Sequence, residues 1–137
     1  MLIVLSAGSP LLADRAADVR TLIGNVATSL TSGNPADAMA PFDKSYVNYE
    51  KLSGYFQGLT NFQIENEVDV TDEQDTEDGA KLTIAWALTL TDLTTNRTDQ
   101  RAGEINVRLV LKGGKWKIVE FSPIEIFNPL PKRDAKP

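Results

Sequence analysis

The stretch LKGGKWKIVEF (residues 111–121) joins two runs of alternating apolar and charged residues through a Gly-Gly pair. Such alternation is typical of a strand with one buried face, and a Gly pair favours a two-residue hairpin turn. The stretch therefore predicts the last hairpin of an antiparallel sheet. Its second run places Glu120 where the alternation expects an apolar side chain, which makes this glutamate a candidate functional residue.

Three segments upstream of this hairpin alternate in the same way and predict the rest of the sheet. They are residues 62–70, 82–90 and 105–111. The acidic segment TDEQDTEDG ends in Asp78-Gly79, a strong hairpin signal, and DLTTNRTDQ predicts the next turn. The second half of the chain is therefore expected to form a four-stranded antiparallel meander.

The first half of the chain predicts three helices. Ser9-Pro10 supplies a capping hydroxyl and a proline at the first helical position, and apolar residues then recur at helical spacing as far as Leu30. Asn34 can cap a second, short helix, and a third is expected over residues 49–60. Because helices must cover the apolar face of the sheet, the chain is predicted to be an α+β domain.

The order of these elements, together with SGNPADAMAPF (residues 32–42), YEKLSGYFQGL (49–59) and GGKWKIVEF (113–121), resembles the nuclear transport factor 2-like superfamily. That group includes ketosteroid isomerase, scytalone dehydratase and SnoaL-like cyclases. The resemblance covers residues 9–127. It implies a cystatin-like cone, in which a strongly bent antiparallel sheet wraps around three N-terminal helices, often with a pocket inside. Many members dimerise through the outer face of the sheet.

The residues that carry catalysis in that superfamily are largely missing from this chain. Ketosteroid isomerase-like sites use a tyrosine on the first helix, whereas the first tyrosine here is Tyr46. Dehydratase-like sites need histidine, and the chain has no His and no Cys. These two absences also remove Ser-His-Asp and Cys-His nucleophiles and the usual zinc sites. We therefore expect no metal site and no cofactor.

Turn geometry places Glu120 within the expected sheet. A two-residue Gly113-Gly114 turn pairs Leu111 with Trp116, Leu109 with Ile118 and Val107 with Glu120. A turn centred on Asn96-Arg97 pairs Trp86 with Val107. Trp86, Val107 and Glu120 would then form a row that faces the helices, where lost hydration favours the neutral form of a carboxyl group.

This row suggests a small apolar pocket with Glu120 as its polar anchor. The residues expected to contact a ligand are Tyr46, Tyr49, Tyr55, Trp86, Val107 and Glu120. Three alternatives stay open: a bulge near Ser122-Pro123 could turn Glu120 outward, Glu120 could pair with an Arg or Lys, or it could lie in water at the open mouth of the cone. The aromatic residues could equally be ordinary core packing.

Three classes of function are compatible with the sequence. The first is a non-catalytic domain that binds a small apolar ligand or a partner. The second is an isomerase- or dehydratase-type enzyme that uses Glu120 as acid or base. The third is an assembly module that forms a homodimer through its outer sheet face, and we favour the first and third together. The residues expected on that face are Thr83, Ala85, Ala87, Thr89, Asn106, Arg108, Val110, Val119 and Phe121.

The charge of the chain and its two ends bear on its partners and its cellular location. The formal net charge is −5 and Lys and Arg are scattered, so no nucleic-acid partner is expected. No apolar run approaches the ~20 residues that span a bilayer. Residues 1–8 are either an apolar lead-in or the remnant of an export signal, which leaves an exported and a cytoplasmic location both open. Residues 128–137 are expected to be a flexible tail.

Overall fold

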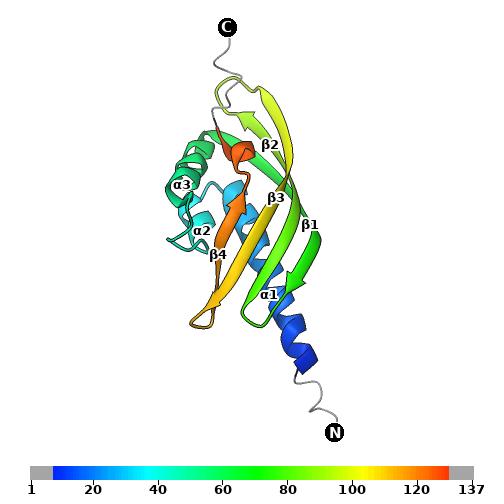
Figure 1. Ribbon diagram of the computed structural model, residues 1–137. Coiled ribbons are helices and arrows are strands. Elements are labelled where there is room, and N and C mark those ends of the chain that lie inside the picture. Colours follow the sequence, from blue (N-terminus) through cyan, green and yellow to red (C-terminus); the bar gives the residue numbers. More distant parts are fainter. Residues whose placement is uncertain (1–7, 130–137) are drawn as a thin grey trace.

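A computed structural model of the chain describes residues 8–129, with side chains described from Ala16 onward. The helices and strands are α1 (Gly8–Thr31), α2 (Pro35–Met39), α3 (Tyr49–Gly58), η2 (Leu59–Asn61), β1 (Phe62–Asp75), β2 (Gly79–Asp92), β3 (Thr98–Lys112), β4 (Lys115–Ser122) and η3 (Glu125–Phe127). The strands form one antiparallel sheet in the order β1-β2-β3-β4, which crosses in front of α1 in Figure 1. The α+β class and the four-stranded antiparallel sheet are thus confirmed.

Two predictions about the chain ends fall largely outside the described residues. The apolar lead-in or export-signal remnant was expected over residues 1–8, of which only Gly8 is described, and the tail over residues 128–137, of which two residues are described. Within the described part of the chain, no helix is long and apolar enough to cross a membrane.

The helical half contains two long helices and one short one. α1 has 24 residues and α3 has 10, whereas α2, where a short helix was expected, is a single turn of five residues. Asn34 caps α2 by accepting a hydrogen bond from the Asp37 backbone N–H at 3.3 Å. Pro41 follows the C-cap residue Ala40, and because a proline has no backbone N–H to donate and its ring clashes with the preceding helical turn, α2 cannot continue.

The sheet register agrees with the sequence near one turn and departs from it at another. Leu111 pairs with Trp116 and Leu109 with Ile118, so the prediction from the Gly113-Gly114 turn is confirmed there. Between β2 and β3 the prediction is wrong, because Trp86 pairs with Gly103 and not with Val107. The chain turns earlier than expected, in a loop whose last part includes Asn96 with a φ of 63°.

The observed pairing of β2 with β3 differs from the predicted pairing by an even number of residues. The side chains of these two strands therefore stay on their predicted faces. The inner face of β2 therefore carries the expected apolar residues. They are Leu82, Ile84, Trp86, Leu88 and Leu90, all buried. One polar side chain joins them: Asn66 of β1 accepts a hydrogen bond from Trp86 Nε1 at 2.9 Å and donates one to the Ala27 carbonyl of α1 at 3.0 Å.

Candidate functional site

The interior between the helices and the sheet is filled by aromatic rings. Trp86 lies edge-on to Phe127 and Phe121, with ring centroids 5.3 Å and 5.9 Å away. Phe56 packs against Phe127 at 5.6 Å, and Phe42 against Phe121 at 5.1 Å. Edge-to-face contacts at these distances are favourable packing. The space between the helices and the sheet is occupied by core side chains at this place.

Glu120 does not face this interior, so the prediction that it lies beside Val107 is wrong. Arg108 pairs with Glu120 while Leu109 pairs with Ile118, which leaves Val119 as an extra residue in β4. This bulge exchanges the faces of the residues that follow it. The Glu120 carboxylate is 62% exposed, and its Oε2 lies 3.2 Å from Arg108 Nε on the outer face.

The same bulge corrects the predicted position of Phe121. Phe121 was expected on the outer face, but its side chain is 0% exposed and pairs with Val107 on the inner face. An aromatic ring gains more from burial than a carboxylate, which would lose its hydration there. The bulge therefore places each of the two neighbouring side chains where its chemistry is favoured. It lies at Val119, a few residues before the Ser122-Pro123 position that the sequence suggested.

Tyr46 is a buried structural residue. Its ring lies 5.6 Å from that of Phe42, and its hydroxyl donates a hydrogen bond to the Phe121 carbonyl. Burial raises the pKa of Tyr46 to about 12, so the hydroxyl stays protonated at neutral pH. This hydrogen bond connects the loop between α2 and α3 to the end of β4.

Tyr49 and Tyr55 lie on the partly buried surface of α3, away from Trp86. Lys44 Nζ lies 5.9 Å above the Tyr49 ring. The Tyr55 hydroxyl donates a hydrogen bond to Glu125 Oε2 at 3.0 Å, and burial together with this carboxylate raises the pKa of Tyr55. The six predicted ligand residues are thus divided between the core (Tyr46, Trp86, Val107), the surface of α3 (Tyr49, Tyr55) and the outer sheet face (Glu120).

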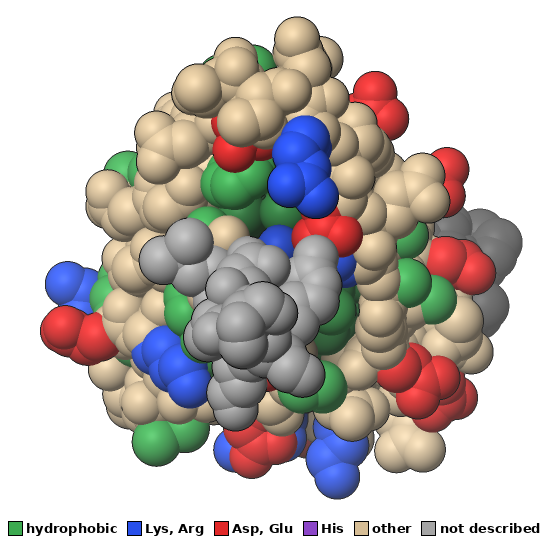
Figure 2. All heavy atoms as spheres, turned by 90° about the horizontal axis from the view of Figure 1, so that it is seen from above, with side chains coloured by type: hydrophobic (Ala, Val, Ile, Leu, Met, Phe, Trp, Pro, Cys, Tyr) green, Lys and Arg blue, Asp and Glu red, His purple; other side chains and the backbone are tan. Residues whose placement is uncertain are grey.

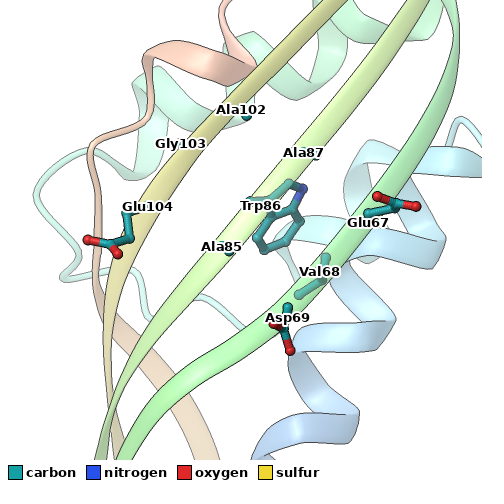
Figure 3. Close-up of a pocket in the computed structure, with 9 residues that line it drawn as sticks. All are labelled: Glu67, Val68, Asp69, Ala85, Trp86, Ala87, Ala102, Gly103 and Glu104. Atoms are coloured by element: carbon teal, nitrogen blue, oxygen red, sulfur yellow. The ribbon is translucent and has the colours of Figure 1, made fainter.

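A more open feature lies on the outer face of the sheet. There a hollow of about 720 Å³ is lined by residues of β1, β2 and β3. Ala85, Ala87 and Ala102 form its floor, and Figure 3 shows the carboxylates of Glu67 and Asp69 projecting from β1 and that of Glu104 from β3. The other lining residues are Val68, Trp86 and Gly103. We call this feature the outer hollow.

The sequence predicted the positions of some residues of the outer hollow and not of others. It placed Ala85 and Ala87 on the outer face correctly, but the wrong register between β2 and β3 hid that Ala102 and Glu104 lie beside them. The carboxylates of the outer hollow had a signal in the sequence, since Glu65, Glu67 and Asp69 occupy alternate positions along β1. That pattern was used only to place the strand.

Charge is unevenly distributed over the outer face. Carboxylates line the β1 side, and Figure 2 shows acidic side chains gathered on the right-hand side, where β1 lies in Figure 1. Lys81 and Arg108 are basic residues that lie beyond the outer hollow, on neighbouring positions of β2 and β3. Between the two regions Thr83 pairs with Asn106, and their side-chain oxygens are 3.4 Å apart.

The carboxylates of the outer hollow do not form a metal site. No group of three or more acidic side chains within the described residues could hold an ion together. The outer hollow instead combines a small apolar floor with separate negative charges, an arrangement that suits contact with a protein surface.

Comparisons with known proteins agree with this architecture. No family model and no curated protein matches the chain. Among solved structures, a conserved protein from Planctomyces limnophilus has a TM-score of 0.73 at 13% identity, over 81% of this chain and 94% of that one. A ketosteroid isomerase-like protein from Erwinia carotovora has a TM-score of 0.64 at 14% identity, covering 78% and 96%.

A nuclear transport factor 2-like superfamily protein from Salmonella enterica is also similar, with a TM-score of 0.61 at 10% identity over 77% of this chain and 88% of that one. At such low sequence identities, these similarities show the fold alone. The chain has the nuclear transport factor 2-like fold, as the sequence resemblance implied, and the activity of any one member does not follow from it.

Proposed function

We propose that this chain is a non-catalytic domain that works by binding, and that its partner is a second copy held through the outer face of the sheet. The observation that carries the proposal is the outer hollow, whose alanine floor lets another surface approach the sheet closely. The floor residues Ala85 and Ala102 are exposed in the single chain. A closed homodimer needs one surface patch that is complementary to itself.

The charges on the outer face are arranged for such self-complementarity. Lys81 and Arg108, the latter in an ion pair with Glu120, lie on one side of the Thr83–Asn106 pair. Asp69 and Glu104 lie on the other side. A two-fold axis near this pair would place the basic residues of one copy over the carboxylates of the other. Complementary charges of this kind fix the register of an interface and disfavour other partners.

The packed interior argues against the other functions that the sequence left open. A small apolar ligand would need the space that Trp86, Phe121 and Phe127 occupy together. An isomerase- or dehydratase-type reaction was assigned to Glu120, which lies in water in an ion pair with Arg108. An acid or base in a water-excluded site acts on the substrate more strongly than one in water, and Glu120 is exposed to water.

Replacing Ala85 with arginine tests the proposed dimer. The new side chain would project from the floor of the outer hollow and keep two copies apart, while the exposed position lets the single chain fold normally. Gln57→Arg adds the same charge at an exposed position on α3 and serves as the matched control.

Light scattering at micromolar concentration measures the result. We expect the wild-type protein and Gln57→Arg to have twice the chain mass of 15.0 kDa, and Ala85→Arg to have the mass of a single chain. A wild-type protein that is monomeric, or an Ala85→Arg variant that stays dimeric, would contradict the proposal.

A further inference from the structure

A second β-bulge lies near the C-terminal end of β1. It exchanges the faces of the sheet on which the following side chains lie. The pairing of β1 with β2 shifts between Val70 and Asp72, which leaves Thr71 as an extra residue. Beyond it, Glu73 pairs with Leu82 and Asp75 with Ala80. Both partners are buried on the inner face, so two acidic side chains that the sequence assigns to a solvated turn lie on the side of the sheet that α1 covers.

Glu73 is the more buried member of this pair. Its side chain is only 9% exposed, and its Oε1 accepts a hydrogen bond from Arg20 Nε of α1 at 2.7 Å. Its Oε2 is buried and has no hydrogen-bond partner. A buried carboxylate oxygen without a hydrogen-bond partner lowers the stability of the folded chain. A hydrogen-bond donor to this atom would therefore be stabilising.

Asp75 can supply that donor if it carries a proton. Its carboxyl group is within hydrogen-bonding reach of Glu73, and burial, this hydrogen bond and the charge of Glu73 together raise the pKa of Asp75, against the opposing effect of Arg20. The residue itself is still open to water, so its proton can exchange with solvent.

We propose that Asp75 holds a proton that it donates to Glu73, and that the pair acts as a pH-operated latch between α1 and the end of the β1–β2 hairpin. With the proton in place, Asp75 donates to Glu73 Oε2 and the Arg20 ion pair holds α1 against β1. Without it, two negative charges face each other. Among the described residues Arg20 is the cation that faces them from α1, and β2 offers only Leu82 and Ala80.

The direction of the pH effect follows from the raised pKa of Asp75. Between the pKa of the unfolded chain and the higher pKa of the folded one, the folded state binds more protons. The stabilising contribution of the pair is therefore complete below the unfolded value and is lost as the pH rises through the folded value. The latch closes in acid and loosens toward neutral pH.

The variant Asp75→Asn tests the latch, because an asparagine can donate to Glu73 at every pH. Urea midpoints of this variant and the wild-type protein are measured from pH 4 to pH 8. We expect the variant to gain over the wild type as the pH rises, by roughly three- to tenfold in the unfolding equilibrium constant. Asp72→Asn, on the outer face of the same strand, is the matched control and should give a difference that does not vary with pH.

A second measurement follows the carboxyl groups themselves by carbon-13 NMR. In the wild-type protein Asp75 should titrate above the ordinary aspartate range, and Glu73→Gln should move its midpoint back toward that range. The proposal is overturned if Asp75 titrates as an isolated aspartate, or if Asp75→Asn and Asp72→Asn show the same pH dependence.

Discussion

Replacing Trp86 with alanine is expected to lower the free energy of unfolding by about 3–5 kcal/mol, the cost of removing a large buried aromatic side chain. The Trp86 side chain is 1% exposed and contacts the rings of Phe121 and Phe127. Its loss would also leave Asn66 Oδ1 without the indole N–H that it binds. Since a whole domain is stable by only about 5–15 kcal/mol, this one change would remove much of the stability.

Urea unfolding measures this effect, with the second tryptophan as the control. Trp116 lies next to the Gly113-Gly114 turn and is only partly buried, so Trp116→Ala should cost clearly less. A loss below about 1 kcal/mol for Trp86→Ala, or equal losses for the two variants, would mean that the aromatic core is misplaced.

Replacing Phe121 with alanine is expected to cost a similar amount, about 3–5 kcal/mol. The phenyl ring is fully buried and meets Phe42, Trp86 and Phe127. The neighbouring Glu120→Ala removes only an exposed ion pair with Arg108, which is worth about 0–1 kcal/mol. Phe121→Ala should therefore lower the free energy of unfolding much more than Glu120→Ala does, although the two residues are adjacent.

This pair of variants tests the bulge at Val119 directly. Without the bulge, the two side chains would exchange faces, and Glu120 would lie inside while Phe121 lay in water. Thermal or urea unfolding of both variants decides between the two arrangements. A larger loss for Glu120→Ala than for Phe121→Ala would contradict the register described here.

Features that are determined by a few neighbouring residues were predicted correctly from the sequence, and features that depend on distant residues were not. The turn at Gly113-Gly114 was predicted correctly because both glycines adopt positive φ, at 56° and 81°, which few other residues tolerate. The pairing of Leu111 with Trp116 follows from that turn. The loop that contains Asn96 gives a weaker signal, since several polar residues there could occupy its centre.

The two bulges could not be predicted from alternation, and they decide the candidate sites. At Val119 the bulge depends on which of Glu120 and Phe121 is buried against a core assembled from distant residues. At Thr71 it turns Glu73 and Asp75 toward α1, in a segment whose acidic composition favours a solvated turn. Alternation identifies the faces of a strand only as far as the first extra residue.

The outer hollow was only partly predictable for a related reason. The alternation in β2 placed Ala85 and Ala87 outside, but their neighbours come from β1 and β3 and depend on the register of two hairpins. Glu104 lies beside Ala85, where the predicted register would have placed another residue. A hollow that spans three strands is a property of the sheet and not of any one segment.

The most direct test of the proposed homodimer is a distance between two copies of one spin label. The chain has no cysteine, so Asn106→Cys provides a single labelling site beside the proposed two-fold axis, and Gln57→Cys provides one on α3 as a control. Because packed sheets lie about 10 Å apart, dipolar spectroscopy should find the two labels at position 106 within about 20 Å of each other. The labels at position 57 should be much farther apart. Light scattering first checks that the protein labelled at position 106 keeps twice the chain mass. In that labelled dimer, no coupling at position 106, or a shorter distance at position 57, would contradict a dimer formed through the outer face of the sheet.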